Sequence, residues 1–273
     1  MNQIAVLLTV YKNDGLREFK VALESLYRQT ISDFDIFIQE DGPVEADIHA
    51  YLIDELSVGK IRYLGERNDN KGFDYSLNEL ISKALREKYE YIVRMDADDI
   101  SMPERLENQL DFMNHNLDID VCGTYIEEFG DGIVYNKVVK YPLNHKDMMS
   151  FFNKRVPIAH VSAFFRSSYF AKAGLYEVNG HYNNGDTLMW MKGFVTGCRF
   201  ANLYYVGVKV RVSKDFFYRR GGWNKTWSDF KNRITVNKAL HFGFASYFYA
   251  VAVAVVNIMP PLMKKYAYKY LRI

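Results

Sequence analysis

Short apolar runs alternate with helical patterns along the first hundred residues of the chain, and this alternation restricts the possible folds more than any other feature. Runs such as IAVLLTV (4–10) have the length of buried strands. Between them apolar residues recur every three or four positions, as on one face of a helix. The alternation predicts a mostly parallel α/β sheet with helices on both faces. In such sheets ligands bind beyond the carboxyl ends of the strands.

The expected elements follow directly from this pattern. Strands are predicted at 4–10, 34–40, 61–64 and 91–95, and helices at 16–27, 48–56, 73–85 and after Ser101. Later in the chain we expect a hairpin turning at Asp131-Gly132, a helix at 145–152, a strand at 161–165, a helix ending at Gly174 and another starting near Asp186. Without a repeat or a low-complexity linker, this pattern indicates one domain up to about residue 225.

Charge is distributed unevenly along the chain. The net charge is only +2, but from Lys209 onward 13 Lys and Arg stand against two acids. That segment therefore carries +11 and the first 208 residues carry −9. A basic segment indicates an anionic partner such as phosphate, nucleic acid or lipid, or else a solvated basic face.

Two features bear on the compartment. Cys122 and Cys198 do not resemble a disulfide or metal framework, which favours a reducing environment. A strand pattern begins within three residues of the N-terminus and leaves no room for a signal peptide. We therefore expect a cytoplasmic location.

Three carboxylates, Asp96, Asp98 and Asp99, follow the strand predicted at 91–95. Carboxylates this close repel one another unless a cation lies between them. Their hard oxygen atoms suit Mn²⁺ or Mg²⁺, which bind through one or two carboxylates plus substrate phosphates. We therefore predict a divalent cation held by Asp96 and Asp98 that grips a diphosphate. A helix cap is the alternative, because this short pattern is a weak signal by itself.

The chain resembles the inverting glycosyltransferase family 2, whose members have the GT-A fold, over about residues 3–225. The matching segments occur in the family's order: TVYKND (9–14), QEDGP (39–43), NKGFDYSLN (70–78), MDADDISMPERL (95–106), PIAHVSAFFR (157–166) and FYRRGGW (217–223). The last two are similar to segments of bacterial surface-polysaccharide transferases of the amylovoran and O-antigen types. The resemblance implies a catalytic domain at 1–225, with a nucleotide-binding half at 1–115 and an acceptor half at 116–225.

The resemblance also implies how a donor would be bound. Thr9 and Tyr11 would line the nucleoside pocket, and Asp41 would hydrogen-bond the uracil. Lys71 would help to hold the nucleotide. A simple turn residue is the alternative for Asp41.

Further matches concern the diphosphate. Asp96 would approach the ribose or the cation, and Asp98 would bind the cation directly. Asp99 would orient the loop or the donor sugar, with a capping role as its alternative. Arg219 and Arg220 would contact the diphosphate, since arginine suits bidentate phosphate recognition.

The family's catalytic base lies in an acidic pair that begins a helix. Here that region reads YNNGDTLMWMKG (182–193), and Asp186 aligns with the second member of the pair. Asp186 would accept the proton of the acceptor hydroxyl, and a plain helix cap is its alternative. Gly185 stands where the family usually has Glu. Gly185→Glu is expected to be tolerated if the loop has room for a side chain.

Three aromatic or imidazole side chains are candidates for substrate contacts. His160 would bind an acceptor or donor phosphate, with a structural histidine as the alternative. Trp223 is a candidate for sugar stacking. Trp190 lies within a predicted helix, where core packing is favoured.

The C-terminal segment has the features of a membrane-associating tail. Residues 240–259 carry no full charge, and beyond Pro260-Pro261 basic residues alternate with tyrosines. Twenty apolar residues can span a bilayer, but this run is only moderately hydrophobic. Basic and aromatic residues together are typical of an anionic membrane interface. We expect a helical tail at 226–273 that lies on the membrane surface, with crossing, or packing on the catalytic domain, as alternatives.

Together these features predict an inverting transferase that moves a hexose or N-acetylhexosamine from a UDP-sugar. The acceptor would be an undecaprenyl-diphosphate-linked saccharide in O-antigen, capsule or exopolysaccharide synthesis, at the inner face of the plasma membrane. No nucleic-acid partner is expected. A nucleotidyltransferase would need a glycine-rich basic loop after the first strand, and a phosphatase would need Thr two residues beyond the acidic pair. A catalytically weak UDP-binding scaffold at the membrane is the remaining alternative, based on Gly185.

Overall fold

The computed structural model describes residues 2–131, 137–178, 185–213 and 223–259. Its strands are β1 (Ile4–Val10), β2 (Phe34–Glu40), β3 (Tyr63–Gly65), β4 (Tyr91–Arg94), β5 (Ile100–Ser101), β6 (Val121–Phe129), β7 (Lys137–Val139), β8 (Phe164–Arg166) and β9 (Phe200–Arg211). Its α-helices are α1 (Leu16–Tyr27), α2 (Ala46–Ser57), α3 (Phe73–Arg86), α4 (Arg105–His115), α5 (His145–Phe152), α6 (Ser168–Ala173), α7 (Gly185–Val195), α9 (Trp223–Ala239) and α10 (Phe244–Ile258). A short 3₁₀ helix, η1, spans His160–Ser162.

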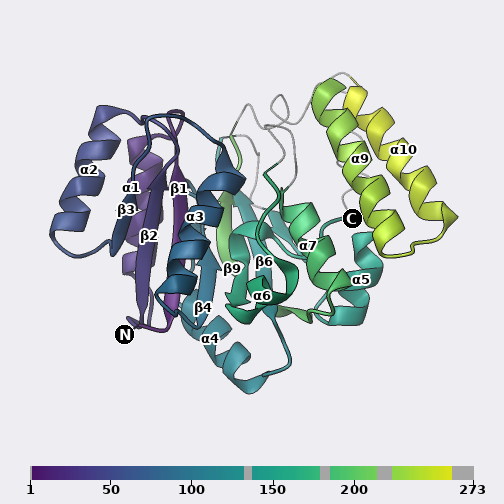
Figure 1. Ribbon diagram of the computed structural model, residues 1–273, viewed down its shortest axis with the longest axis horizontal. Coiled ribbons are helices and arrows are strands. Elements are labelled where there is room, and N and C mark those ends of the chain that lie inside the picture. Colours follow the sequence, from purple (N-terminus) through teal and green to yellow (C-terminus); the bar gives the residue numbers. More distant parts are fainter. Residues whose placement is uncertain (1, 132–136, 179–184, 214–222, 260–273) are drawn as a thin grey trace.

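These strands form one sheet that runs through the molecule, with helices on both sides (Figure 1). Its order is β3-β2-β1-β4-β8-β6-β9-β5, with β7 beside β6. The first four strands are parallel, as predicted. Beyond β4 the sheet is mixed, because β8 runs antiparallel to both β4 and β6, while β9 runs parallel to β6. The predicted α/β architecture is confirmed.

Alternate side chains of β1 enter two different cores. Ile4, Val6 and Leu8 are buried against α1, α2 and α4. Ala5 and Leu7 are buried on the other face, in the core that also receives side chains of α3, α5, α6 and α7. A strand covered on both faces reads as a continuous apolar run. This explains why IAVLLTV shows no polar alternation.

Several predicted elements are confirmed with their bounds, among them β1, β2, α1 and α5. The strand predicted at 61–64 forms only at 63–65. The strand predicted at 161–165 is divided into η1 and β8, because the amides of Ser162 and Ala163 bond back to the carbonyls of Ala159 and His160. The pairing of β6 with β7 confirms the hairpin. Its connection at 132–136 lies outside the described residues.

The two C-terminal helices lie side by side at the end of the molecule opposite β3 (Figure 1). Helix α9 contacts α7, and its Val236 is buried in the second core. Helix α10 packs against α9. The predicted start of the tail at residue 226 therefore falls inside α9. Among the helices that the structure describes, none combines the length and the apolar character needed to cross a membrane.

Candidate active site

The fold gathers several of the predicted site residues at one edge of the sheet. Thr9 lies near the end of β1, and Asp41 directly follows β2. The turn from Asp96 to Asp99 follows β4. These strands are parallel neighbours, so their carboxyl ends meet. Tyr11 follows β1 and is held in a short turn in which its amide donates to Asp14 Oδ2 at 2.9 Å.

Asp41 organises the loop that precedes α3. Its carboxylate accepts hydrogen bonds from the backbone amides of Lys71 at 2.9 Å and Gly72 at 3.0 Å, and it pairs with Arg67. Gly42 is required beside it, since its φ is +82° and a Cβ there would lie 2.8 Å from the Asn70 amide nitrogen. A carboxylate offers about four acceptor positions, and hydrogen bonds from Arg67, Lys71 and Gly72 already engage both Asp41 oxygens. The predicted uracil contact stays a prediction.

Arg67 is a site residue that the sequence analysis missed. Its guanidinium is largely buried and contacts Asp41, Ser76 and Glu79. It also lies over the Tyr75 ring, and the Lys71 ammonium lies 5.0 Å from the centroid of the same ring. The contacts tie the loop after β3 to α3. In the sequence, only its position just before the segment NKGFDYSLN (70–78) indicated that Arg67 lies near the predicted site.

The acidic turn is held from the opposite side by Arg211, the last residue of β9. The Arg211 amide donates to Asp99 Oδ1 at 2.7 Å, and Arg211 Nε donates to the Asp98 carbonyl at 3.0 Å. Asp99 is only 1% exposed, and its Oδ2 has no hydrogen-bond partner among the described residues. β9 was not predicted from the sequence.

The carboxylates of this turn fit a divalent cation. Burial and the charge of Asp96 raise the pKa of Asp98. Burial and the charges of Asp96 and Asp98 raise the pKa of Asp99 well above its usual range. A cation bound at this turn would offset the repulsion among its carboxylates. Asp96 and Asp98 as direct ligands remain a prediction.

Arg94, at the end of β4, was also missed. It is 5% exposed, and its Nη2 pairs with Asp96 Oδ1 at 2.5 Å. Its guanidinium lies 4.7 Å from the centroid of the Phe73 ring, in the first turn of α3. Nε and Nη1 have no partner among the described residues. Arg94 thus links the acidic turn to α3.

The candidate base Asp186 lies in the first turn of α7, where its Oδ1 accepts from the Thr187 amide at 2.7 Å. Asp74, in the first turn of α3, is its electrostatic neighbour. Burial and the charge of Asp186 raise the pKa of Asp74 to about 6, with Arg94 acting in the opposite direction. Two carboxylates from two helix starts therefore lie close together. Asp74 was not predicted as a site residue.

His160 is enclosed by aromatic rings. Its Nε2 lies 2.7 Å from the Tyr176 hydroxyl, and its ring contacts Phe73 and Trp190 edge-on. Burial and the charge of Arg94 lower its pKa well below the usual range. A neutral, packed imidazole fits the structural alternative, and the phosphate contact stays a prediction.

The remaining predicted residues are two tryptophans, which the structure describes, and two arginines, which it does not. Trp190 is buried and stacks on Phe165 at 5.5 Å between centroids, as the core prediction required. Trp223 begins α9 and is 73% exposed. Arg219 and Arg220 lie outside the described residues.

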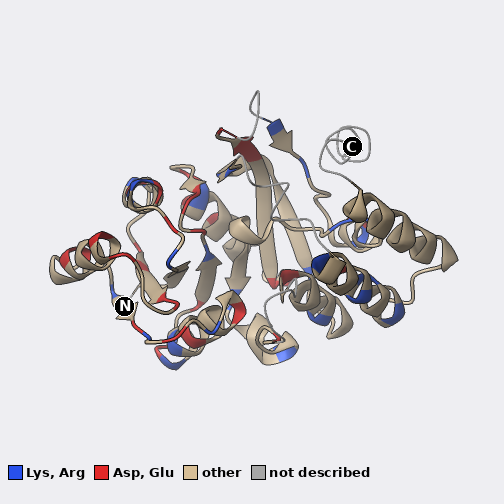
Figure 2. Ribbon diagram, turned by 90° about the horizontal axis from the view of Figure 1, so that it is seen from above, with Lys and Arg blue, Asp and Glu red and all other residues tan. Residues whose placement is uncertain are grey.

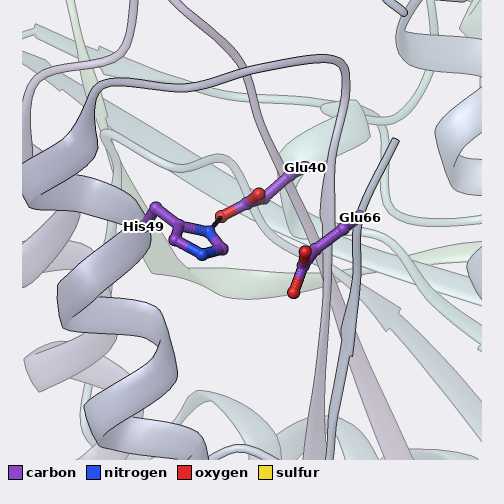
Figure 3. Close-up of side chains that lie close together, drawn as sticks. All are labelled: Glu40, His49 and Glu66. Carbon is purple, nitrogen blue, oxygen red and sulfur yellow. Dashed lines mark hydrogen bonds and ion pairs between the residues drawn. The ribbon is translucent and has the colours of Figure 1, made fainter. Parts of the chain in front are cut away.

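A second group of potential ligands lies on the α2 side of Asp41. Figure 3 shows Glu40, His49 and Glu66, whose ligand atoms lie within 4.8 Å of one another. His49 Nδ1 is already 2.9 Å from Glu40 Oε1, and this hydrogen bond and charge raise the pKa of His49. The hydrogen bond between His49 Nδ1 and Glu40 Oε1 already uses one potential ligand atom of each residue.

The sheet topology, with an acidic turn after β4, defines a GT-A glycosyltransferase fold. The sequence pattern of the family described as Glycosyl transferase family 2 matches residues 6–174. The chain belongs to this family, which confirms the resemblance found in the sequence.

Two curated relatives are similar in sequence to this chain over most of their length. The chain is 25% identical over 272 residues to an Escherichia coli UDP-Gal:alpha-D-GlcNAc-diphosphoundecaprenol beta-1,3-galactosyltransferase, covering 98% of this chain and 95% of the relative. It is 28% identical over 220 residues to the amylovoran biosynthesis glycosyltransferase AmsE of Erwinia amylovora, covering 81% of this chain and 80% of the relative.

Solved structures support the fold. S. aureus TarS 1–349 in complex with UDP-GlcNAc gives a TM-score of 0.63 at 13% identity, with 95% of this chain and 82% of that chain covered. The mannosyltransferase PcManGT from Pyrobaculum calidifontis, in complex with GDP-Man and Mn²⁺, gives a TM-score of 0.60 at 13% identity, with 98% of this chain and 79% of that chain covered.

Proposed function

We propose that this glycosyltransferase moves a hexose or N-acetylhexosamine from a UDP-sugar to a lipid-diphosphate-linked saccharide, with inversion to a β linkage. The observation that carries the proposal is the meeting of the acidic turn after β4 with the starts of α3 and α7, linked through Arg94. The names of the relatives support the donor and acceptor classes, since one uses UDP-Gal and a diphosphoundecaprenol-linked sugar and another acts in amylovoran synthesis.

On the donor side, Asp41, Lys71, Thr9 and Tyr11 would hold the nucleoside. The loop between β3 and α3 is already fixed through Asp41 before any donor binds. A preformed loop reduces the entropy lost on binding. The predicted uracil contact would be made at Asp41, beside this loop.

The acidic turn would hold the diphosphate through a divalent cation, Mn²⁺ or Mg²⁺, bound by Asp96 and Asp98. Such a cation neutralises the charge that develops on the departing diphosphate. Arg94 pairs with Asp96 and keeps its carboxylate at the sheet edge. A structure of the same fold that contains GDP-Man and Mn²⁺ supports cation use.

Asp186 would take the proton of the acceptor hydroxyl. The acceptor oxygen then forms a bond to the anomeric carbon as the bond to UDP breaks, and UDP leaves as the diphosphate anion. A single displacement inverts the anomeric configuration. The position of Asp186 at a helix start keeps the carboxylate near the positive end of the helix dipole.

The C-terminal helices support a peripheral position on the cytoplasmic face of the plasma membrane. One stripe of α10 exposes Phe244, Phe248, Val251, Val255 and Ile258. Their spacing of four and three residues places them on one helix face. In Figure 2, α10 has no charged residue, whereas Lys and Arg follow α9 beside it. An apolar stripe next to basic side chains fits an anionic lipid surface.

Transfer assays test the proposal. UDP-Glc, UDP-Gal, UDP-GlcNAc and UDP-GalNAc would be supplied with GlcNAc-diphospho-lipid acceptors and either Mn²⁺ or EDTA. We expect cation-dependent release of UDP coupled to formation of a disaccharide-lipid. UDP binding without turnover of any donor would instead favour the scaffold alternative.

A further inference from the structure

The carboxylate of Asp74 lies against Gly185, the residue that begins α7. A Cβ added to Gly185 would lie 2.5 Å from the Asp74 carboxyl carbon and closer still to both carboxylate oxygens. That separation is far below normal van der Waals contact. The space where a side chain of residue 185 would start is therefore taken by an acidic group from α3.

The position of Asp74 is fixed by its surroundings. Phe73 beside it is covered by Arg94, and Asn78, one turn further along α3, makes two hydrogen bonds with the backbone of Tyr176, at 2.8 and 2.9 Å. These contacts tie α3 to the segment that precedes α7. The packing of these two elements thus holds the start of α3, and with it Asp74, beside the start of α7.

We propose that Asp74 is the acidic partner of Asp186, acting across the gap between the starts of α3 and α7 in place of a carboxylate on residue 185. This inference rests on the proposed role of Asp186. Asp74 is a positioning residue, because it acts on the reaction through Asp186. The absence of a side chain at Gly185 is then compensated by this contact.

The electrostatics agree with this role. The charge of Asp186 raises the pKa of Asp74, and the interaction between two carboxylates acts equally on both. The negative charge of Asp74 therefore favours proton uptake by Asp186. Among the described residues, Arg94 from β4 and Tyr176, whose hydroxyl contacts His160, also face the pair. The positive charge of Arg94 opposes the repulsion between Asp74 and Asp186 by lowering the pKa of Asp74.

The contact also bears on the expectation for Gly185→Glu. A side chain at residue 185 would require the Asp74 carboxylate to move. Gly185→Glu alone should lower activity, and Asp74→Gly combined with Gly185→Glu should recover part of it. In that double variant the carboxylate introduced at residue 185 replaces the carboxylate removed from residue 74.

The test measures kcat, KM for the UDP-sugar and the pH dependence of kcat for the full chain carrying Asp74→Asn, with Asp74→Ser as a second variant. We expect kcat to fall about 10- to 100-fold, within the range for assisted proton transfer. KM should stay within about twofold, and the acidic limb of the pH profile should move to lower pH. An unchanged kcat with an unmoved acidic limb in folded Asp74→Asn would overturn the proposal, as would loss of activity without recovery in the double variant.

Asp186→Asn in the same assay separates this inference from the proposed function. If Asp186→Asn retains full turnover, the base assignment itself is wrong. If Asp186→Asn is inactive and Asp74→Asn is normal, only the partnership fails. Circular dichroism and thermal unfolding confirm that each variant is folded.

Discussion

The Arg211 amide donates to Asp99 Oδ1 at 2.7 Å, so the end of β9 fixes the most deeply buried carboxylate of the acidic turn. The other Asp99 oxygen is buried without a hydrogen-bond partner among the described residues. Buried polar atoms without partners are rare and costly. The hydrogen bond from Arg211 therefore ties the end of β9 to the acidic turn.

Asp98→Ala tests the cation site. We expect it to abolish transfer and to remove the Mn²⁺-dependent part of UDP binding, since a predicted ligand is lost. Isothermal titration with UDP, with and without Mn²⁺, measures both parts. Asp118→Ala is the matched control, because Asp118 is exposed and pairs only at the surface with Arg199. Normal Mn²⁺-dependent turnover in Asp98→Ala would show that the assignment is wrong.

Arg67→Met tests the loop that precedes α3. Asp41 and Arg67 are both nearly buried, and removing one partner of a buried pair costs about 3–5 kcal/mol. We expect lower thermal stability and a UDP dissociation constant at least about tenfold higher. Arg62→Met is the control, since Arg62 forms only a long surface pair with Glu87. If UDP affinity were unchanged, the loop would have no role in donor binding.

The sequence predicted the first half of the fold closely. IAVLLTV is buried on both faces, so its apolar run gave the strand bounds, and FDIFIQE was recognised by its alternating apolar core before the turn at Asp41-Gly42. β9 was not predicted because its burial follows no two-residue alternation and it lies beyond the regular βα alternation. Its register depends on pairing with β6, which is far away in the sequence.

The site was predicted only in part, for a related physical reason. Asp41 and Asp98 stand at strand ends, where position in the sequence already indicates a ligand site. Arg67, Arg94 and Asp74 act through contacts across elements, which no local pattern reveals. Gly185 is the clearest example, because the group that occupies its side-chain position is the carboxylate of Asp74, 111 positions earlier in the chain.

The pair of His49 and Glu40 predicts a pH dependence of stability. The pKa of His49 in the folded state is raised above 6.5 by Glu40. Its stabilisation is therefore fully present below pH 6.5 and is lost as the pH rises through the folded pKa. Because the His49 side chain is 43% exposed, the effect should stay below about 1 kcal/mol.

Urea unfolding of the wild type and His49→Gln at pH 6 and pH 9 measures this effect. The difference in unfolding free energy should be larger at pH 6. His115→Gln is the control, because the His115 side chain is 74% exposed in a surface pair. If the wild type and His49→Gln differed in unfolding free energy by the same amount at both pH values, the pair of His49 and Glu40 would make no pH-dependent contribution to stability.

Phe244→Asp combined with Phe248→Asp tests the membrane surface without deleting a helix. Both side chains are more than 75% exposed, so folding should be unaffected. We expect co-sedimentation with phosphatidylglycerol vesicles to fall several-fold while UDP binding is retained. Leu117→Asp is the control, as Leu117 is 77% exposed far from α10 in the sequence. Equal sedimentation of all variants would exclude the stripe as the lipid contact.

The stereochemistry of the product tests the central claim most directly. Transfer from an α-linked UDP-sugar by a single displacement, with Asp186 taking the proton of the acceptor hydroxyl, must give the β anomer. Proton NMR of the purified product reports the anomeric configuration through the coupling of the anomeric proton. We predict a β-linked product from the wild type and turnover reduced by about 10²- to 10⁴-fold in Asp186→Asn. An α-linked product would contradict the account.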